Sequence, residues 1–91
     1  MQEEFNMENR TLELAYLVLT GKKSLRDLTV EECLSIIESF YGCQADEYRD
    51  AASSDIGDGF KLGIMRNGAK MALSRAEENT EYIAYRNLKS E

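Results

Sequence analysis

Residues 28–42 have the sequence LTVEECLSIIESFYG, and this stretch contains the clearest helix signals in the chain. Thr29 is a good N-cap, and Glu32 three residues later completes a capping box, in which each side chain bonds the other residue's backbone N–H. Gly42 marks the end of the helix. We therefore expect a helix with one buried apolar face, formed by Val30, Cys33, Leu34, Ile37, Phe40 and Tyr41.

Before this stretch, residues 9–20 predict another helix. The run from residue 11 to residue 19 is apolar almost all round, which is typical of a helix buried on several sides, in its own core or against another chain. Gly21 is a natural stop, because glycine readily adopts the left-handed conformation found just after a helix. Residues 1–8 are polar, and we expect them to be disordered.

After this stretch, Ala45, Tyr48, Ala51 and Ala52 have the spacing of a third helix. Residues 53–59, SSDIGDG, predict a break, because serine, aspartate and glycine are poor helix formers. We expect Asp55 to cap a new helix.

Residues 60–78 allow two interpretations. Asn67-Gly68 is a strong hairpin signal and would join two strands, 60–66 and 69–75. Helix-forming residues dominate the segment, however, and Ile64 is its one β-branched residue, so we favour a helix. Residues 80–89 could extend this helix, start another or form an edge strand. The favoured helix has two opposite apolar stripes: Leu62, Met65, Ala69, Ala72, Leu73 and Ala76 on one side, and Phe60, Ile64 and Met71 on the other.

These elements predict a single domain over residues 1–91, an all-α bundle of three to four helices that is oligomeric. An α+β fold with a C-terminal β-hairpin at Asn67-Gly68 is the alternative. A chain of 91 residues buries only a modest core, which favours association with further copies.

The composition argues against catalysis. The chain has no histidine, and so lacks the commonest general base and metal ligand. Cys33 and Cys43 lie ten residues apart, which is neither a zinc-ligand spacing nor a redox motif. We expect no catalytic residue, no metal, no cofactor and no enzymatic activity. No apolar run is long enough to span a membrane, so we expect no membrane partner and a cytoplasmic location.

Charge is distributed unevenly along the chain. Residues 31–58 contain eight acidic groups and one basic group, Arg49, whereas residues 59–75 contain four basic groups and no acid. With a net charge of −6, the chain lacks the basic footprint of a nucleic-acid-binding protein. The acidic block instead predicts a face that binds a partner protein with a basic surface, formed by Glu31, Glu38, Asp46, Glu47 and Asp50.

The basic groups offer a second candidate site, for phosphate or another anion. Three of them come just before the helix that begins near Thr29, where the helix dipole favours anions. Two more lie four residues apart on the next long helix and face the same way. Alternatively, the basic groups of residues 59–75 form ion pairs with the acidic helix that begins near Thr29. The candidate anion-binding residues are Lys22, Lys23, Arg26, Arg66 and Lys70.

Small residues recur at helical spacing between residues 59 and 76, and they would let another backbone approach closely. Because the same helix has apolar stripes on two sides, we expect it to mediate self-association. The expected oligomer interface consists of Gly59, Gly63, Ile64, Gly68 and Met71.

Part of this pattern resembles a known family. The run Arg26-Asp27-Leu28-Thr29-x-Glu31-Glu32, followed later by Gly59-Phe60 and then Arg66, is similar to phage anti-CBASS proteins, which sequester cyclic oligonucleotides as helical oligomers. The similarity touches about a dozen residues, and Leu25 stands where the family has an aromatic residue. The resemblance implies that Arg66 and the loop of Lys22, Lys23 and Arg26 contact phosphates.

Two functions are therefore expected. The small size suits an accessory protein of a phage or mobile element, acting in counter-defence as an inhibitor or modulator of a host protein. Such a protein would work by stoichiometric binding, here through the acidic face. The alternative is an oligomeric sponge that sequesters a phosphate-bearing signal such as a cyclic nucleotide.

Overall fold

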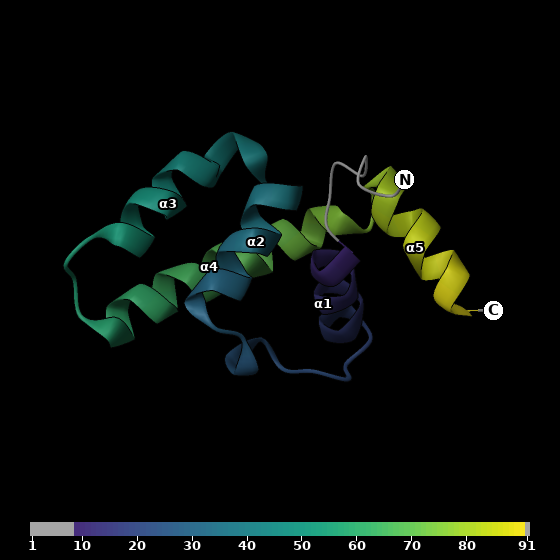
Figure 1. Cartoon of the computed structure of the whole chain (residues 1–91), viewed down its shortest axis with the longest axis horizontal. Helices are drawn as coiled ribbons and strands as arrows, with labels where there is room; N and C mark the ends of the chain where they lie inside the picture. The colour runs from purple at the N-terminus through teal and green to yellow at the C-terminus, as the bar shows by residue number, and fades with distance from the viewer. Residues whose placement is uncertain (1–8, 91) are drawn as a thin grey trace.

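The computed structural model describes residues 9–90, and this part of the chain contains helices and no strand (Figure 1). The all-α prediction is confirmed. The hairpin alternative is wrong, because one helix runs through both Asn67 and Gly68. The described residues form five α-helices rather than three to four: α1 (Asn9–Leu19), α2 (Val30–Phe40), α3 (Ala45–Ser53), α4 (Asp58–Ala76) and α5 (Thr80–Ser90). Two short 3-10 helices, η2 (Leu25–Asp27) and η3 (Gly42–Gln44), precede α2 and α3.

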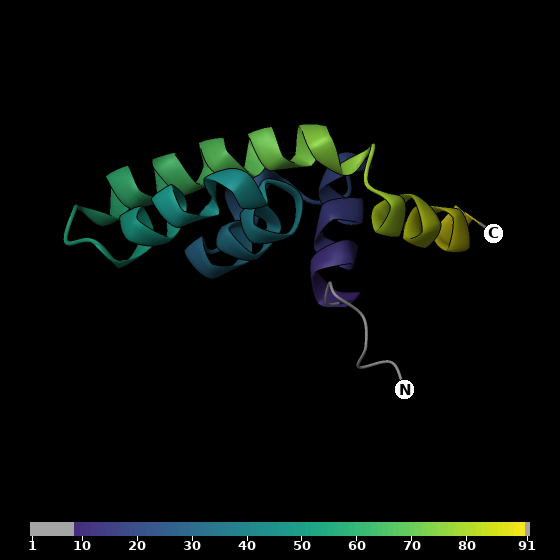
Figure 2. The same cartoon turned by 90° about the horizontal axis from the view of Figure 1, so that it is seen from above.

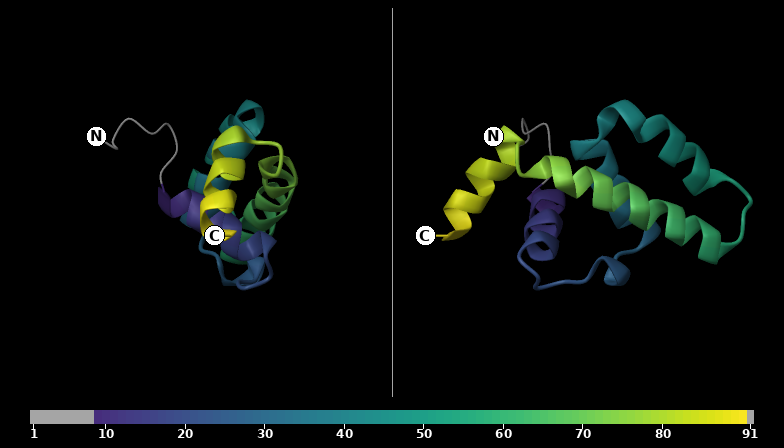
Figure 3. Two further views of the ribbon diagram at one scale, coloured as in Figure 1. Left: turned by 90° about the vertical axis from the view of Figure 1, so that its right-hand side faces the viewer. Right: turned by 180° about the vertical axis from the view of Figure 1, so that it is seen from behind.

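The longest helix, α4, forms one side of the molecule. Figure 2 shows α2 and α3 lying on the same side of α4, with α1 and α5 toward its C-terminal end. The most extensive contact between helices is that of α2 with α4. The end-on view in Figure 3 shows the same division, with α4 to one side of the other helices. The molecule thus has a layer made of α4 and a second layer made of its neighbours.

The predicted capping box of α2 is present. The Glu32 backbone N–H donates to Thr29 Oγ1 at 3.1 Å, and the Thr29 backbone N–H donates to Glu32 Oε1 at 2.9 Å. These bonds satisfy two backbone donors that the first turn of a helix would otherwise leave unpaired.

The buried face of α2 differs from the predicted one. Val30 and Leu34 are only partly buried, whereas Ile36, which the prediction left out, is fully buried. The apolar residues of this helix form one broad arc with Ile36 at one edge and Leu34 at the other, so the sequence does not fix which edge faces inward. Packing against α4, the most extensive contact of α2, gives a buried face that includes Ile36. The α2 residues in the core are Cys33, Ile36, Ile37 and Phe40.

In the core between the two layers, the backbone of α4 comes very close to side chains of α2 and α3 at one residue, Gly68. A Cβ atom on Gly68 of α4 would lie 2.5 Å from Cε1 of Tyr48 and 2.8 Å from Cδ1 of Ile37. Both distances are far below van der Waals contact, so only glycine fits here. Of the two predicted apolar stripes of α4, the one that begins with Leu62 faces the core. All of its members are buried except Leu62, which is partly buried. Its buried members are Met65, Ala69, Ala72, Leu73 and Ala76.

The ends of α1 and α4 are formed in different ways. Gly21 follows α1 with φ of 81°, and the Lys22 backbone N–H donates to the Leu17 carbonyl at 2.8 Å, which confirms the predicted glycine stop. In contrast, α4 begins at Asp58 after Gly57, with no side-chain cap. The prediction that Asp55 caps this helix is therefore wrong.

The C-terminal segment forms a separate helix, α5, which is one of the three predicted alternatives. Asn79 Oδ1 accepts a hydrogen bond of 3.0 Å from the Tyr82 backbone N–H and so caps the helix. Tyr82 is buried and meets Phe40 edge to face, with ring centroids 6.3 Å apart. This aromatic contact docks α5 against the end of α2.

Candidate functional site

The predicted acidic residues lie on the exposed surfaces of α2 and α3, which are neighbouring helices. Glu31 and Glu38 lie two turns apart on the same side of α2, and Arg49 of α3 links this side to the next helix. Arg49 Nε donates to Glu38 Oε2 at 2.7 Å, and its Nη1 bonds the Asp46 carboxylate. All five predicted residues are exposed: Glu31, Glu38, Asp46, Glu47 and Asp50.

Arg49 is the basic group within this acidic face. The hydrogen bond that Arg49 donates to the Glu38 carboxylate raises the pKa of the Arg49 guanidinium above its usual value. Because Arg49 bonds Glu38 and Asp46, the charges of Glu31, Glu47 and Asp50 are those most available to a partner. The sequence could not show this pairing, since Arg49 and Glu38 are eleven residues apart and lie on different helices.

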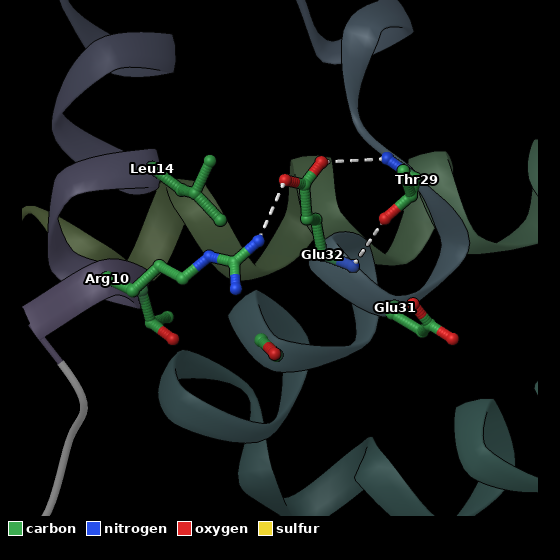
Figure 4. A pocket seen from close by; sticks show the side chains of 7 residues that line it. Arg10, Leu14, Thr29, Glu31 and Glu32 are labelled. Carbon is green, nitrogen blue, oxygen red and sulfur yellow. Dashed lines mark hydrogen bonds and ion pairs between the residues drawn. The ribbon is translucent and has the colours of Figure 1, made fainter.

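A neighbouring pocket lies between α1 and the start of α2 (Figure 4). Its volume is about 220 Å³. Arg10 reaches across it from α1, with its Nη2 atom 3.6 Å from Glu32 Oε2, while the same carboxylate also caps α2. Glu31 lies at the edge of the pocket and is not joined to Arg10 (Figure 4). The lining residues are Arg10, Thr11, Leu14, Thr29, Glu31, Glu32 and Ser35.

The structure brings together part of the predicted anion site. Arg66 Nη2 donates to the backbone carbonyl of Arg26 at 2.9 Å, although the two residues are forty apart in sequence. Arg66 Nε is buried without a hydrogen-bond partner among the described residues. Burial raises the pKa of the nearby Cys33 thiol to about 11, against an opposing effect of the Arg66 charge.

Lys70 and the loop lysines take separate positions. Lys70 lines an apolar pocket of about 390 Å³ together with Leu25, the residue before Arg26. Lys22, by contrast, is close enough to Glu13 of α1 to help lower the pKa of that carboxyl. The structure therefore groups Arg26, Arg66 and Lys70 around η2 and α4. Lys23 is partly buried in the same loop.

The proposed ion pairing of the basic block with α2 does not hold. Among residues 9–90, no ion pair joins Lys61, Arg66, Lys70 or Arg75 to an acidic residue of α2. Arg75 instead lies over the ring of Tyr41, with its Cζ atom 4.9 Å from the ring centroid.

The predicted oligomer interface is divided between two sides of α4. Gly59, Gly63, Ile64 and Met71 are exposed. Gly68 is buried against Tyr48 and Ile37 of the same chain, so it belongs to the core and not to this surface. Sequence spacing alone could not separate the glycine needed inside the fold from those outside it.

One polar cluster was not predicted. Tyr85 of α5 donates to the Glu13 carboxylate of α1, and Lys89 Nζ lies 3.2 Å from Glu13 Oε1. The bond from Tyr85 is the main cause of the lowered pKa of Glu13. Glu13 is more than seventy positions from both Tyr85 and Lys89 in the sequence, so no local pattern signals their contact. The cluster fastens α5 to α1.

Comparison with known proteins gave no match to any protein-family model, curated protein or solved structure. No helix within residues 9–90 is long and apolar enough to cross a membrane.

Proposed function

We propose that this protein is a non-enzymatic binding protein whose acidic face on α2 and α3 docks onto a basic surface of a partner protein. The observation that supports this proposal most is the exposure of all five predicted carboxylates on two adjacent helices, with Arg49 between them. Five carboxylates and one guanidinium leave a net charge of −4 on this face. A concentrated field of one sign attracts and orients an oppositely charged partner.

The expected role is stoichiometric inhibition or modulation of a host protein, as an accessory protein of a phage or mobile element would act. Both cysteines are free, with Cys33 buried and Cys43 exposed. Free thiols are typical of a reducing compartment, which supports a cytoplasmic location.

A matched pair of charge reversals tests the acidic face. E47K/D50K changes two exposed acids of this face, whereas E77K/E78K changes the net charge by the same amount in the exposed turn after α4. In affinity capture from a host lysate, the wild type and E77K/E78K should retain the same basic protein. E47K/D50K should lose it, and added salt should weaken its retention because salt screens exposed charges.

Equal retention by both variants would contradict the proposal. Loss in both would show that net charge, and not this face, governs the interaction. Quantitative mass spectrometry of the captured proteins separates these results.

A second candidate function is supported by the contact between Arg66 and the Arg26 carbonyl. This contact brings the Arg66 guanidinium to the backbone of Arg26, and Lys70 lines a pocket with the neighbouring residue Leu25; a phosphate-bearing ligand such as a cyclic nucleotide would bind these basic residues. We propose that such a ligand would raise the melting temperature. Because Arg66 also supports the fold, the test uses K70A and R26A, which should remove the shift. No shift with millimolar cyclic or linear nucleotides would eliminate this candidate.

A further inference from the structure

The pocket between α1 and the start of α2 is lined by a buried residue with a hydroxyl group. Thr11 lines this pocket and is only 4% exposed. Its hydroxyl makes no hydrogen bond with any residue in the 9–90 range, and neither does that of Ser35, which lines the same pocket from α2. Buried polar groups nearly always have a hydrogen-bond partner. A polar ligand in this pocket would supply one.

Arg10 provides a positive charge on the α1 side of the pocket. Its Nη2 atom lies 3.6 Å from Glu32 Oε2, which is longer than a hydrogen bond, and its side chain is 76% exposed. An exposed ion pair of this kind contributes little to stability, so Arg10 can turn to a ligand with little loss. Because a guanidinium presents several N–H donors in one plane, a carboxylate is a group that it binds well.

Glu31 provides a negative charge on the other side. Figure 4 shows Arg10 reaching in from α1, whereas Glu31 lies beyond Glu32 at the opposite edge. Glu31 is exposed and joins no ion pair within the described part of the chain. It is therefore available to the positively charged end of a ligand whose carboxylate meets Arg10.

These charges and the size of the pocket argue against other ligands. One guanidinium and two carboxylates leave a net charge of −1 among the lining residues, which disfavours a free anion such as phosphate. The guanidinium in turn disfavours a metal ion, and no group of three or more metal-ligating residues occurs between residues 9 and 90. The volume of about 220 Å³ is below the ~300–1,000 Å³ of pockets for drug-sized ligands, so a nucleotide is too large.

We propose that this pocket binds a small zwitterion of the amino-acid class. The ligand carboxylate bonds Arg10 and the hydroxyls of Thr11 and Ser35, and its ammonium group faces Glu31. Leu14, which is 8% exposed, lies beside its aliphatic part. The proposal does not rest on the binding of a partner protein, although Glu31 belongs to both surfaces.

NMR titration of the ¹⁵N-labelled protein tests the proposal, with β-alanine, L-valine and γ-aminobutyrate as probes that differ in the separation of their charges. At least one should bind with a Kd in the low millimolar range, as expected for so few atoms. The amide shifts should be confined to residues 10–14 and 29–35. The N-acetyl and carboxamide derivatives of the best probe each lack one charge and should bind at least about tenfold more weakly.

Substitutions on the two sides of the pocket test the orientation of the ligand. R10Q and E31Q each remove one exposed charge and should raise the Kd at least about tenfold. E47Q is the matched control for E31Q, because Glu47 is exposed on α3 outside the pocket, and it should leave the Kd unchanged. T11V keeps the size of the buried side chain and should raise the Kd several-fold, since it removes the hydroxyl.

The amide spectrum of each variant checks that the fold is retained. The absence of saturable shifts with all three probes up to about 50 mM would overturn the proposal. Equal affinity for the derivatives that lack a charge would do the same, as would an unchanged Kd in R10Q or in E31Q.

Discussion

The two helices that share the largest contact, α2 and α4, are specified in different ways. The start of α2 is fixed locally, by a capping box within four residues of sequence. The start of α4 has no side-chain cap, and its glycines and two opposite apolar stripes give no clear inward face. For α2, local signals fix where the helix begins. For α4, packing against its neighbours decides what is core and what is surface.

Truncation of one isoleucine on each helix should give the largest contrast. I37A removes a fully buried side chain from α2 and should lower the free energy of unfolding by about 2–5 kcal/mol, because it leaves a cavity. I64A makes the same chemical change on the outer face of α4 and should lower it by less than about 1 kcal/mol. Urea denaturation measures the loss in both variants. Equal losses would contradict the assignment of the outer face.

The glycines of α4 should respond to alanine in opposite directions. G68A should destabilise the protein by about 1–3 kcal/mol, because its Cβ would overlap Tyr48 and Ile37. G63A should stabilise the protein by about 0.5–1 kcal/mol, because alanine is the better helix former and nothing lies within 4 Å of the added atom. Thermal unfolding of dilute samples compares the two variants. A stabilising effect of G68A would show that α3 and α4 are packed less closely than the distance from Gly68 to Tyr48 indicates.

Changes at the two helix starts should have the smallest effects. T29A removes the capping side chain of α2 and should cost about 1 kcal/mol. G57S offers α4 a capping hydroxyl at a backbone conformation that serine tolerates, with φ of −59° and ψ of 151°, and should add only a few tenths of a kcal/mol. Chemical denaturation of the pair tests whether α2 relies on its cap more than α4 does. A neutral T29A would remove this difference between the helices.

Local patterns predicted much of the fold. The end of α1, the start of α2, the helical state of α4 and the exposure of the acidic residues follow from a glycine stop, a capping box, residue propensity and charge. The burial of Ile36, the start of α4 at Asp58 and the salt bridge of Arg49 with Glu38 were not predicted. Each of these depends on where a second helix lies, and no short stretch of sequence contains that information.

The sequence by itself determined that the chain is helical, that acidic and basic groups are segregated, and that α4 has apolar residues on two sides. Only the tertiary structure decided which of those sides is buried. It placed Gly68 in the core while leaving Gly63 exposed, and it brought Arg66 to the Arg26 carbonyl across forty residues. The physical reason is that helix formation depends on neighbours three or four residues away, whereas burial and pairing depend on contacts between distant segments.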